Sequence, residues 1–166
     1  MKLAGIVFIV LSAGSVGYGM AVAMKKKCIV LRQLLDSLQV LKNEIALCGT
    51  PLPQAFALMA VSAEGELERI FSDVAKDMDQ HRWVTPYASF QAAMETVSEE
   101  EISPILLSLA RKLGKYDIDA QLQGIEMARC QTEELLQQLE RERHVKSRTY
   151  ETLGICAGLA VAILLI

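Results

Sequence analysis

The sequence has 166 residues, enough for a single domain, and 52% of them are hydrophobic although only 5% are aromatic. Leu, Ala, Ile and Val therefore supply the apolar surface, and this balance favours helices over a β-sandwich or barrel. The net charge is only −3, but residues 33–140 carry 8 basic and 18 acidic side chains, a net charge of −10. An acidic body of this kind makes nucleic acid an unsuitable partner.

The N-terminal stretch Leu3–Met24 contains no charged residue in 22 positions. As a helix it would span about 33 Å, enough for a hydrocarbon core of about 30 Å. Three lysines follow it directly, and positive charge after an apolar run holds that side in the cytoplasm. We therefore predict a retained membrane anchor over residues 1–24. The alternative is a signal peptide, because Ala21-Val22-Ala23 resembles a cleavage site.

The next segment predicts a helix that continues from the anchor without a break. Its apolar stripe recurs at spacings of three and four residues, at Leu31, Leu34, Leu38, Leu41, Ile45 and Cys48. Gly49 is expected to end this helix. Thr50 and Pro51 are then predicted as the N-cap and first residue of a second helix.

Four more helices are expected before the C-terminus. A third begins after Gly65, and a fourth begins at Thr85-Pro86. A fifth begins either at a capping box formed by Ser98 and Glu101 or, because of Pro104, only at Ser103, and it ends at Gly114. Asp117 is expected to cap the sixth helix, which runs without proline to the C-terminus. The first and last helices are expected to be long and antiparallel.

The C-terminal stretch Thr152–Ile166 has no charge in 15 positions and would span only about 22 Å as a helix. A thinned bilayer or a neighbouring membrane helix would accommodate it, and Gly154 and Gly158 are candidates for close helix pairing. The predicted fold is thus all-α. It is a six-helix bundle over residues 25–148, continuous with an N-terminal transmembrane helix and with a C-terminal one over residues 149–166.

Basic residues border both apolar ends and are predicted to contact anionic headgroups of the membrane. They are Lys25, Lys26, Lys27 and Arg32 after the first run, and Arg141, Arg143, Lys146 and Arg148 before the second.

The sequence offers little support for catalysis. It contains no phosphate-binding glycine loop, no H-E-x-x-H and no G-x-S-x-G motif, and its 4 cysteines form no C-x-x-C pair. His81 is expected to stabilise a helix C-terminus, and His144 belongs to the basic border. We therefore predict neither enzyme activity nor a metal site nor a cofactor.

Two corners between helices are candidates for a partner groove, although helix capping alone also explains each of them. The first comprises Glu44, Gly49, Thr50, Pro51 and Leu52. The second comprises Leu113, Gly114, Lys115, Tyr116, Asp117 and Gln121.

These corners also carry a family resemblance. The sequence resembles the stage III sporulation protein AB family of endospore-forming bacteria over its full length. The matching residues are Met1-Lys2-Leu3, Leu31-Arg32-Gln33-Leu34, Glu44-Ile45, Thr50-Pro51-Leu52, Leu113-Gly114, Asp117, Gln121 and Tyr150-Glu151 with the apolar tail.

The resemblance implies a six-helix cytosolic domain similar to one repeat of the inner-membrane platform protein of type II secretion and type IV pilus systems. Those platform proteins carry two such repeats and this chain has one, so a homo-oligomer or another membrane protein would have to complete the assembly.

The resemblance further implies a non-enzymatic structural subunit of the channel between mother cell and forespore. Its expected place is the mother-cell membrane, with the central domain in the cytoplasm. Its expected partners are other sporulation channel membrane proteins and a cytosolic motor ATPase, stage III sporulation protein AA. The alternatives are a peripheral membrane adaptor outside any transport assembly, a membrane enzyme, and an exported domain.

Overall fold

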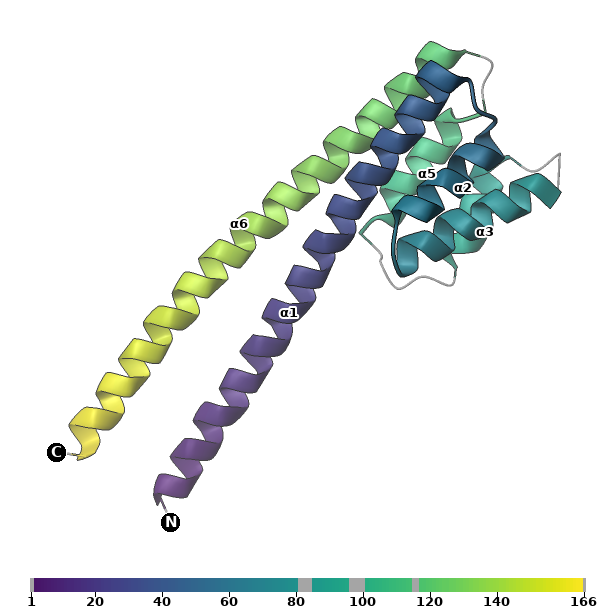
Figure 1. The fold of residues 1–166 in the computed structure, drawn as a ribbon. Helices are drawn as coiled ribbons and strands as arrows, with labels where there is room; N and C mark the ends of the chain where they lie inside the picture. Colours follow the sequence, from purple (N-terminus) through teal and green to yellow (C-terminus); the bar gives the residue numbers. More distant parts are fainter. Residues whose placement is uncertain (1, 81–84, 96–100, 115–116, 166) are drawn as a thin grey trace. The chain divides into compact units, whose positions relative to one another are not determined.

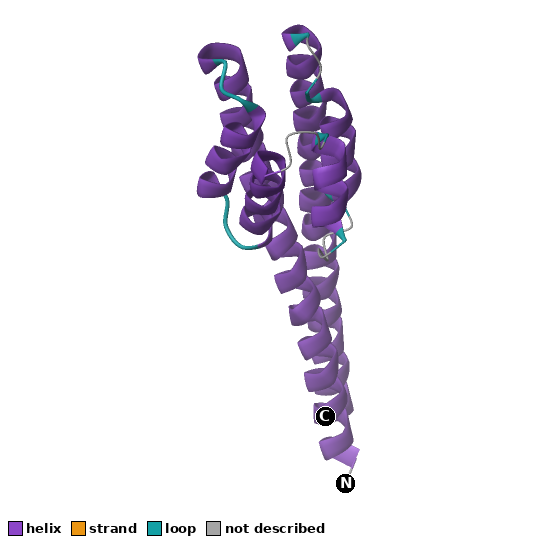
Figure 2. Cartoon of the chain, turned by 90° about the vertical axis from the view of Figure 1, so that its right-hand side faces the viewer, coloured by secondary structure: helices purple, strands orange, loops and turns teal. Residues whose placement is uncertain are grey.

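The computed structural model describes the backbone of residues 2–80, 85–95, 101–114 and 117–165, and the side chains of residues 22–80, 85–95, 101–114 and 117–142. Within these ranges the chain is helical, with no strand (Figures 1 and 2). The elements are α1 (Lys2–Asn43), a π-helical turn η1 (Glu44–Cys48), α2 (Leu52–Ser62), α3 (Glu66–Gln80), α4 (Pro86–Met94), α5 (Ser103–Lys112) and α6 (Ile118–Leu165).

The chain divides into two compact units. One contains residues 1–29 and 137–166, where the early part of α1 and the late part of α6 are each an unbroken helix. The other contains residues 30–136 and holds the remaining elements. The prediction that α1 runs without a break out of the N-terminal apolar stretch is confirmed.

In the unit of residues 30–136, the predicted stripe of α1 lies in the core. Leu31, Leu34, Leu38, Leu41 and Ile45 are buried. Across the core the short helices pack in chain order, α2 on α3, α3 on α4 and α4 on α5. Three phenylalanines, one from each of α2, α3 and α4, lie edge to face at the centre of these helices, with ring centroids 5.3 Å apart for Phe56–Phe90 and 6.5 Å apart for Phe71–Phe90. Such edge contacts suit the charge distribution of aromatic rings.

Glycines end the helical segments where the sequence predicts. Gly49 has φ +62° and Gly114 has φ +76°, both in the left-handed region that a residue with a Cβ rarely adopts. Gly65, immediately before α3, has φ +68°.

The predicted helix starts are only partly confirmed. Thr85 caps α4, and its hydroxyl accepts a hydrogen bond from the Ala88 amide at 3.3 Å. Asp117 caps α6 by accepting from the Asp119 amide at 3.0 Å. The fifth helix begins at Ser103, the later of the two predicted starts. The predicted capping box includes Ser98, which lies outside the described residues.

The predicted transmembrane helices are contradicted. Among the described residues, no helix combines the length and the apolar character needed to cross a bilayer. From residue 22 onward, where the side chains of α1 are described, three consecutive lysines and then Arg32 interrupt the apolar pattern. Charged side chains also recur along α6 up to residue 142. The fold class is therefore corrected to an all-α fold of six helices within the described ranges, without the two membrane-spanning ends.

Candidate interaction surface

The structure brings the two predicted corners together in the unit of residues 30–136. A Cβ built on Gly114, in the second corner, would lie 3.8 Å from the Leu52 Cδ1 in the first. The same position would lie 3.3 Å from the Pro86 Cγ at the start of α4. The end of α5 therefore meets the starts of α2 and α4, and the two corners border one surface.

The first corner is fixed by Glu44. Its backbone carbonyl accepts from the amides of Gly49 and Thr50, the latter at 3.1 Å, and its carboxylate accepts from the Thr50 hydroxyl at 2.6 Å. The predicted N-cap role of Thr50 is thus wrong. Pro51 takes that position instead, and its carbonyl accepts from the Ala55 amide at 3.0 Å.

Leu47, which the sequence analysis did not select, lies in η1 beside the first corner and is 82% exposed. A π turn closes its hydrogen bonds five residues apart instead of four, so it inserts a residue and rotates the residues after it away from the core stripe. Cys48, predicted as the last residue of the stripe, is therefore exposed. Apolar spacing alone carries no signal of this insertion.

The second corner has a buried and an exposed part. Leu113 is buried, whereas Asp117 is exposed, and the Asp117 carbonyl accepts from the Gln121 amide at 3.2 Å. Lys115 and Tyr116 lie outside the described residues. Ile118 begins α6 with 54% of its surface exposed.

A cation lies beside the second corner. The Arg111 guanidinium donates to the Tyr87 hydroxyl at 3.2 Å, and its carbon lies 4.9 Å from the centre of the Tyr87 ring. Arg111 is in the last turn of α5, three residues before Gly114. The pair joins α4 to α5 through a hydrogen bond and a cation–π contact, and neither residue was selected from the sequence.

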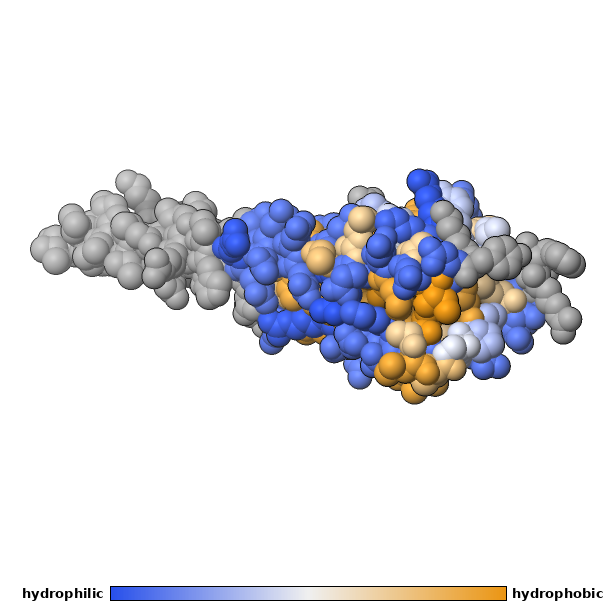
Figure 3. All heavy atoms as spheres, turned by 90° about the horizontal axis from the view of Figure 1, so that it is seen from above, coloured by the Kyte–Doolittle hydropathy of each residue, from blue (hydrophilic) through white to orange (hydrophobic). Residues whose placement is uncertain are grey.

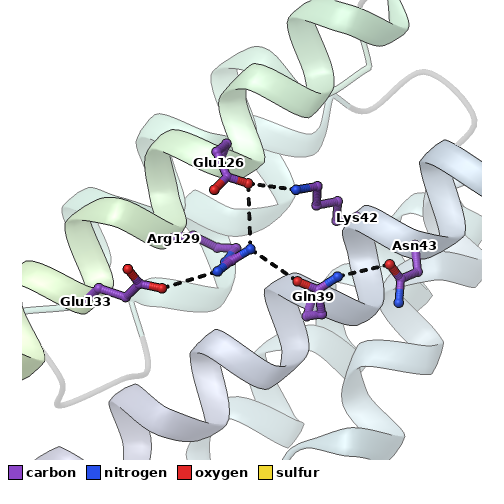
Figure 4. Close-up of polar contacts among 6 residues, drawn as sticks. All are labelled: Gln39, Lys42, Asn43, Glu126, Arg129 and Glu133. Atoms are coloured by element: carbon purple, nitrogen blue, oxygen red, sulfur yellow. Dashed lines mark hydrogen bonds and ion pairs between the residues drawn. The ribbon is translucent and has the colours of Figure 1, made fainter.

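A polar clasp joins α1 to α6 in the same unit (Figure 4). The Lys42 ammonium pairs with the Glu126 carboxylate at 2.8 Å, and the Arg129 guanidinium donates to the Gln39 side-chain oxygen at 3.2 Å. As the residue number rises along α1 it falls along α6, so the two helices run antiparallel there, as predicted. Arg129 also pairs with Glu133 at 3.2 Å.

The clasp affects the ionisation of Glu126. The hydrogen bond from Lys42 is the largest influence and lowers the pKa of the carboxyl group, and the nearby Arg129 adds to the lowering. Desolvation opposes both.

The antiparallel pairing also places two exposed apolar residues at one end of the helix pair. The end of α1 and the start of α6 lie at the same end, so Leu47, which follows α1, and Ile118, which begins α6, both lie there.

The predicted membrane-contact residues are only partly described. Lys25, Lys26, Arg32 and Arg141 are exposed and Lys27 is half-buried, whereas the side chains of Arg143, Lys146 and Arg148 lie outside the described residues. Two apolar residues of α1, Val22 and Ile29, are also exposed, at 49% and 47%. Gly154 and Gly158 fall within α6, but their surroundings are outside the described side chains, so their helix-pairing role remains a prediction.

The described side chains do not form a metal site, since no three His, Cys, Asp or Glu residues among them come together. His81 and His144 lie outside the described side chains. Cys28, Cys48 and Cys130 are free thiols. The surface at the corners offers apolar contact and carboxylates to a partner, and Arg111 lies beside it.

Comparisons with known proteins decide the family. The pattern that defines the family described as stage III sporulation protein AB matches residues 2–166. This chain belongs to that family. A relative of the same description from Bacillus subtilis (strain 168) is 27% identical over 169 residues, which cover 99% of each chain. The resemblance found in the sequence is confirmed, and it supports a role in sporulation.

A solved structure supports the fold. The chain described as stage III sporulation protein AB is 22% identical and superposes with a TM-score of 0.64, covering 72% of this chain and 98% of its own length. At this identity the likeness supports the helical architecture and assigns no residue a role.

Proposed function

We propose that this protein is a non-enzymatic structural subunit of the sporulation channel between mother cell and forespore, where it acts as a platform for a cytosolic motor ATPase. The family membership supports the sporulation role. The observation that carries the proposal is the meeting of the two corners at Leu52 and Gly114, where the end of α5 meets the starts of α2 and α4.

We define the corner surface by its described residues: Glu44, Leu47, Gly49, Thr50, Pro51, Leu52, Leu113, Gly114, Asp117, Ile118 and Gln121. Leu47 and Ile118 supply exposed apolar area, and exposed apolar residues that lie together are typical of interaction sites. Asp117 and Asp119 are exposed next to Ile118, so a partner with basic side chains would suit this surface.

The proposed partners are the ATPase, stage III sporulation protein AA, and other membrane proteins of the channel. A single six-helix domain offers one corner surface, so an assembly needs either several copies of this chain or a second protein with a similar domain. The proposed orientation places residues 25–148 in the mother-cell cytoplasm.

Contact with the membrane surface is part of the same proposal. Exposed Lys25 and Lys26 lie between the exposed apolar residues Val22 and Ile29 on α1. A helix that interleaves basic and apolar side chains in this way suits an anionic lipid surface. The remaining predicted basic residues would extend the contact.

Co-purification from sporulating cells tests the platform role. The tagged full chain in mild detergent should retain the ATPase or other channel proteins, and Leu47→Asp with Ile118→Asp should abolish this retention. Gln123→Asp with Gln131→Asp is the matched control, because it adds the same two charges at exposed positions of α6 without removing apolar area. Retention by the double variant would overturn the role of the corner surface. A wild-type chain that co-purifies with none of these proteins would favour the peripheral adaptor.

Flotation with lipid vesicles tests the membrane contact. The full chain should float with vesicles that contain phosphatidylglycerol, and Lys25→Glu with Lys26→Glu should reduce the floated fraction. Unchanged flotation of this variant would contradict the proposed headgroup contact.

The two histidines test the absence of catalysis. If the protein has a structural role and no catalytic one, His81→Ala and His144→Ala should leave spore yield unchanged. A large loss of spores from either variant at normal protein level would instead favour an enzyme.

A further inference from the structure

Helix α2, like α4, carries no charged side chain in an otherwise acidic body. Residues Leu52–Ser62 contain no Asp, Glu, Lys or Arg, although residues 33–140 have a net charge of −10. A helix that is apolar on all sides is normally buried on all sides. In α2 only one side is buried within the chain, where Phe56 and Met59 have no exposed surface.

The opposite side of α2 is an exposed face without charge. Leu58 is 43% exposed and Val61 is 85% exposed, and they lie one turn apart. Gln54 and Ala57 are exposed on the same side, at the spacing of one helix face. A value of 85% for a valine within a helix means that its side chain touches almost nothing in the chain. We refer to these four residues as the α2 face. Figure 3 shows apolar residues reaching the surface among hydrophilic ones on the side it presents.

Carboxylates follow the α2 face along the chain. Glu64 is exposed three residues after Val61, in the short connection to α3. Glu68 in the first turns of α3 is also exposed, and α3 packs directly against α2. The exposed face of α2 is thus apolar, and the segment that follows its C-terminal end carries exposed carboxylates.

We propose that the α2 face is a docking site for an amphipathic helix of a partner protein. Apolar side chains of that helix pack on Leu58 and Val61, and its Lys or Arg side chains pair with Glu64 and Glu68. Helices bound by one apolar stripe are a recurring recognition mode, and basic residues at the rim fix orientation and favour encounter. A second copy of this chain fits less well, because it would bring the same acidic edges together.

The docking site shares no residue with the corner surface and does not depend on the proposed function. Its experiment uses a labelled model peptide of about five helical turns, built from Leu on one face and Lys on the other. The full chain is captured on a sensor surface in detergent-free buffer, and the peptide is titrated over it. We expect saturable binding that weakens at least tenfold in Leu58→Ser with Val61→Ser.

Further variants separate the parts of the proposal. Glu64→Gln with Glu68→Gln should weaken binding severalfold, and a peptide with Gln in place of Leu should not bind. Leu47→Ser is the control, since it removes a leucine from the corner surface that is about as exposed as Val61, at 82% against 85%. Circular dichroism verifies that each variant is folded, which is expected because all of these positions are exposed.

Three results would overturn the docking site. Equal binding by the wild type and Leu58→Ser with Val61→Ser would mean that the peptide binds elsewhere. An equal loss in Leu47→Ser would mean that exposed leucine in general attracts it, or that the corner surface is its site. A wild-type dimer that becomes a monomer on Val61→Ser, with no peptide binding, would identify a second copy as the occupant.

Discussion

Gly124 in α6 lies so close to Lys112, in the last turn of α5, that a Cβ built on the glycine would come within 2.9 Å of the lysine Cβ. It would also lie 3.1 Å from the Lys112 Cδ. The Lys112 ammonium then reaches along α6 to the Met127 sulfur at 3.3 Å. The absence of a side chain at Gly124 therefore sets how closely α5 approaches α6.

The first prediction is that Gly124→Ala lowers stability, although alanine is the better helix former. The gain in helix propensity is about 1 kcal/mol, whereas overpacking a close contact costs about 1–3 kcal/mol. The clash is with a Cβ, which moves only with its backbone, so we expect a net loss of about 1 kcal/mol in urea unfolding. Gln123→Ala, at the exposed neighbouring position, should not lose stability. If Gly124→Ala instead raised the free energy of unfolding, α5 would be able to shift away from α6 at little energetic cost.

The second prediction separates the two glycines at the corners. Both have positive φ, so alanine at either position costs about 1–2 kcal/mol of backbone strain. A Cβ on Gly49 would meet nothing within 4 Å, but one on Gly114 would press on Pro86. Gly114→Ala should therefore lower the free energy of unfolding more than Gly49→Ala, and Gly49→Asn should be milder still because Asn tolerates this conformation. If the two alanine variants lost equal free energy of unfolding, the contact of the new Cβ at position 114 with Pro86 would carry no cost.

These positions show which features the sequence could reveal. The helix ends at Gly49 and Gly114 and the caps at Thr85 and Asp117 depend on one or two neighbouring residues, so local chemistry is enough to predict them. The buried stripe of α1 is equally local, since its leucine spacing alone defines it.

The features that the sequence analysis missed have two origins. One is a residue inserted into a helix, and the other is contact between residues far apart in the sequence. The turn η1 adds a residue that leaves no trace in the spacing, and it exposes Cys48. The close approach of Gly124 to Lys112 and the meeting of Leu52 with Gly114 depend on how separate helices pack. Each corner could be predicted by itself, but their union in one surface could not.

The third prediction concerns a buried hydroxyl. Ser37 has no exposed surface, and its Oγ has no hydrogen-bond partner among the described residues. An unsatisfied buried polar group costs about 1–3 kcal/mol, and alanine is also the better helix former. Ser37→Ala should therefore raise the free energy of unfolding by about 1 kcal/mol.

Thr132 provides the comparison for Ser37. It is equally buried, but its hydroxyl donates to the Ala128 carbonyl at 2.7 Å. Thr132→Ala removes a satisfied bond and leaves a small cavity, so it should lower stability by about 1–2 kcal/mol. If Ser37→Ala and Thr132→Ala shifted the urea midpoint in the same direction, the hydrogen bonding of the hydroxyl group would not decide whether its removal stabilises the protein.

The fourth prediction concerns pH and the clasp between α1 and α6. The hydrogen bond from Lys42 lowers the pKa of Glu126 below its ordinary value of 4.5. Because the folded protein has the lower pKa, the Glu126 contribution to stability is present above the unfolded value. It is lost as the pH falls through the folded value. The free energy of unfolding of the wild type should therefore exceed that of Glu126→Gln at about pH 6, and the difference should shrink toward about pH 3.

Lys42→Gln tests whether Lys42 causes this pH dependence. Without the Lys42 ammonium group, the largest influence on the pKa of Glu126 is removed. Glu126→Gln should therefore change the free energy of unfolding less in the Lys42→Gln background than in the wild type. The carboxyl is at the surface, so added salt should also reduce the wild-type difference, because exposed charges are screened over about 10 Å at 0.1 M salt. Arg129 remains beside Glu126 at 3.7 Å and should preserve a residual effect. An undiminished pH dependence in the Lys42→Gln background would mean that Arg129, and not Lys42, is the main partner of Glu126.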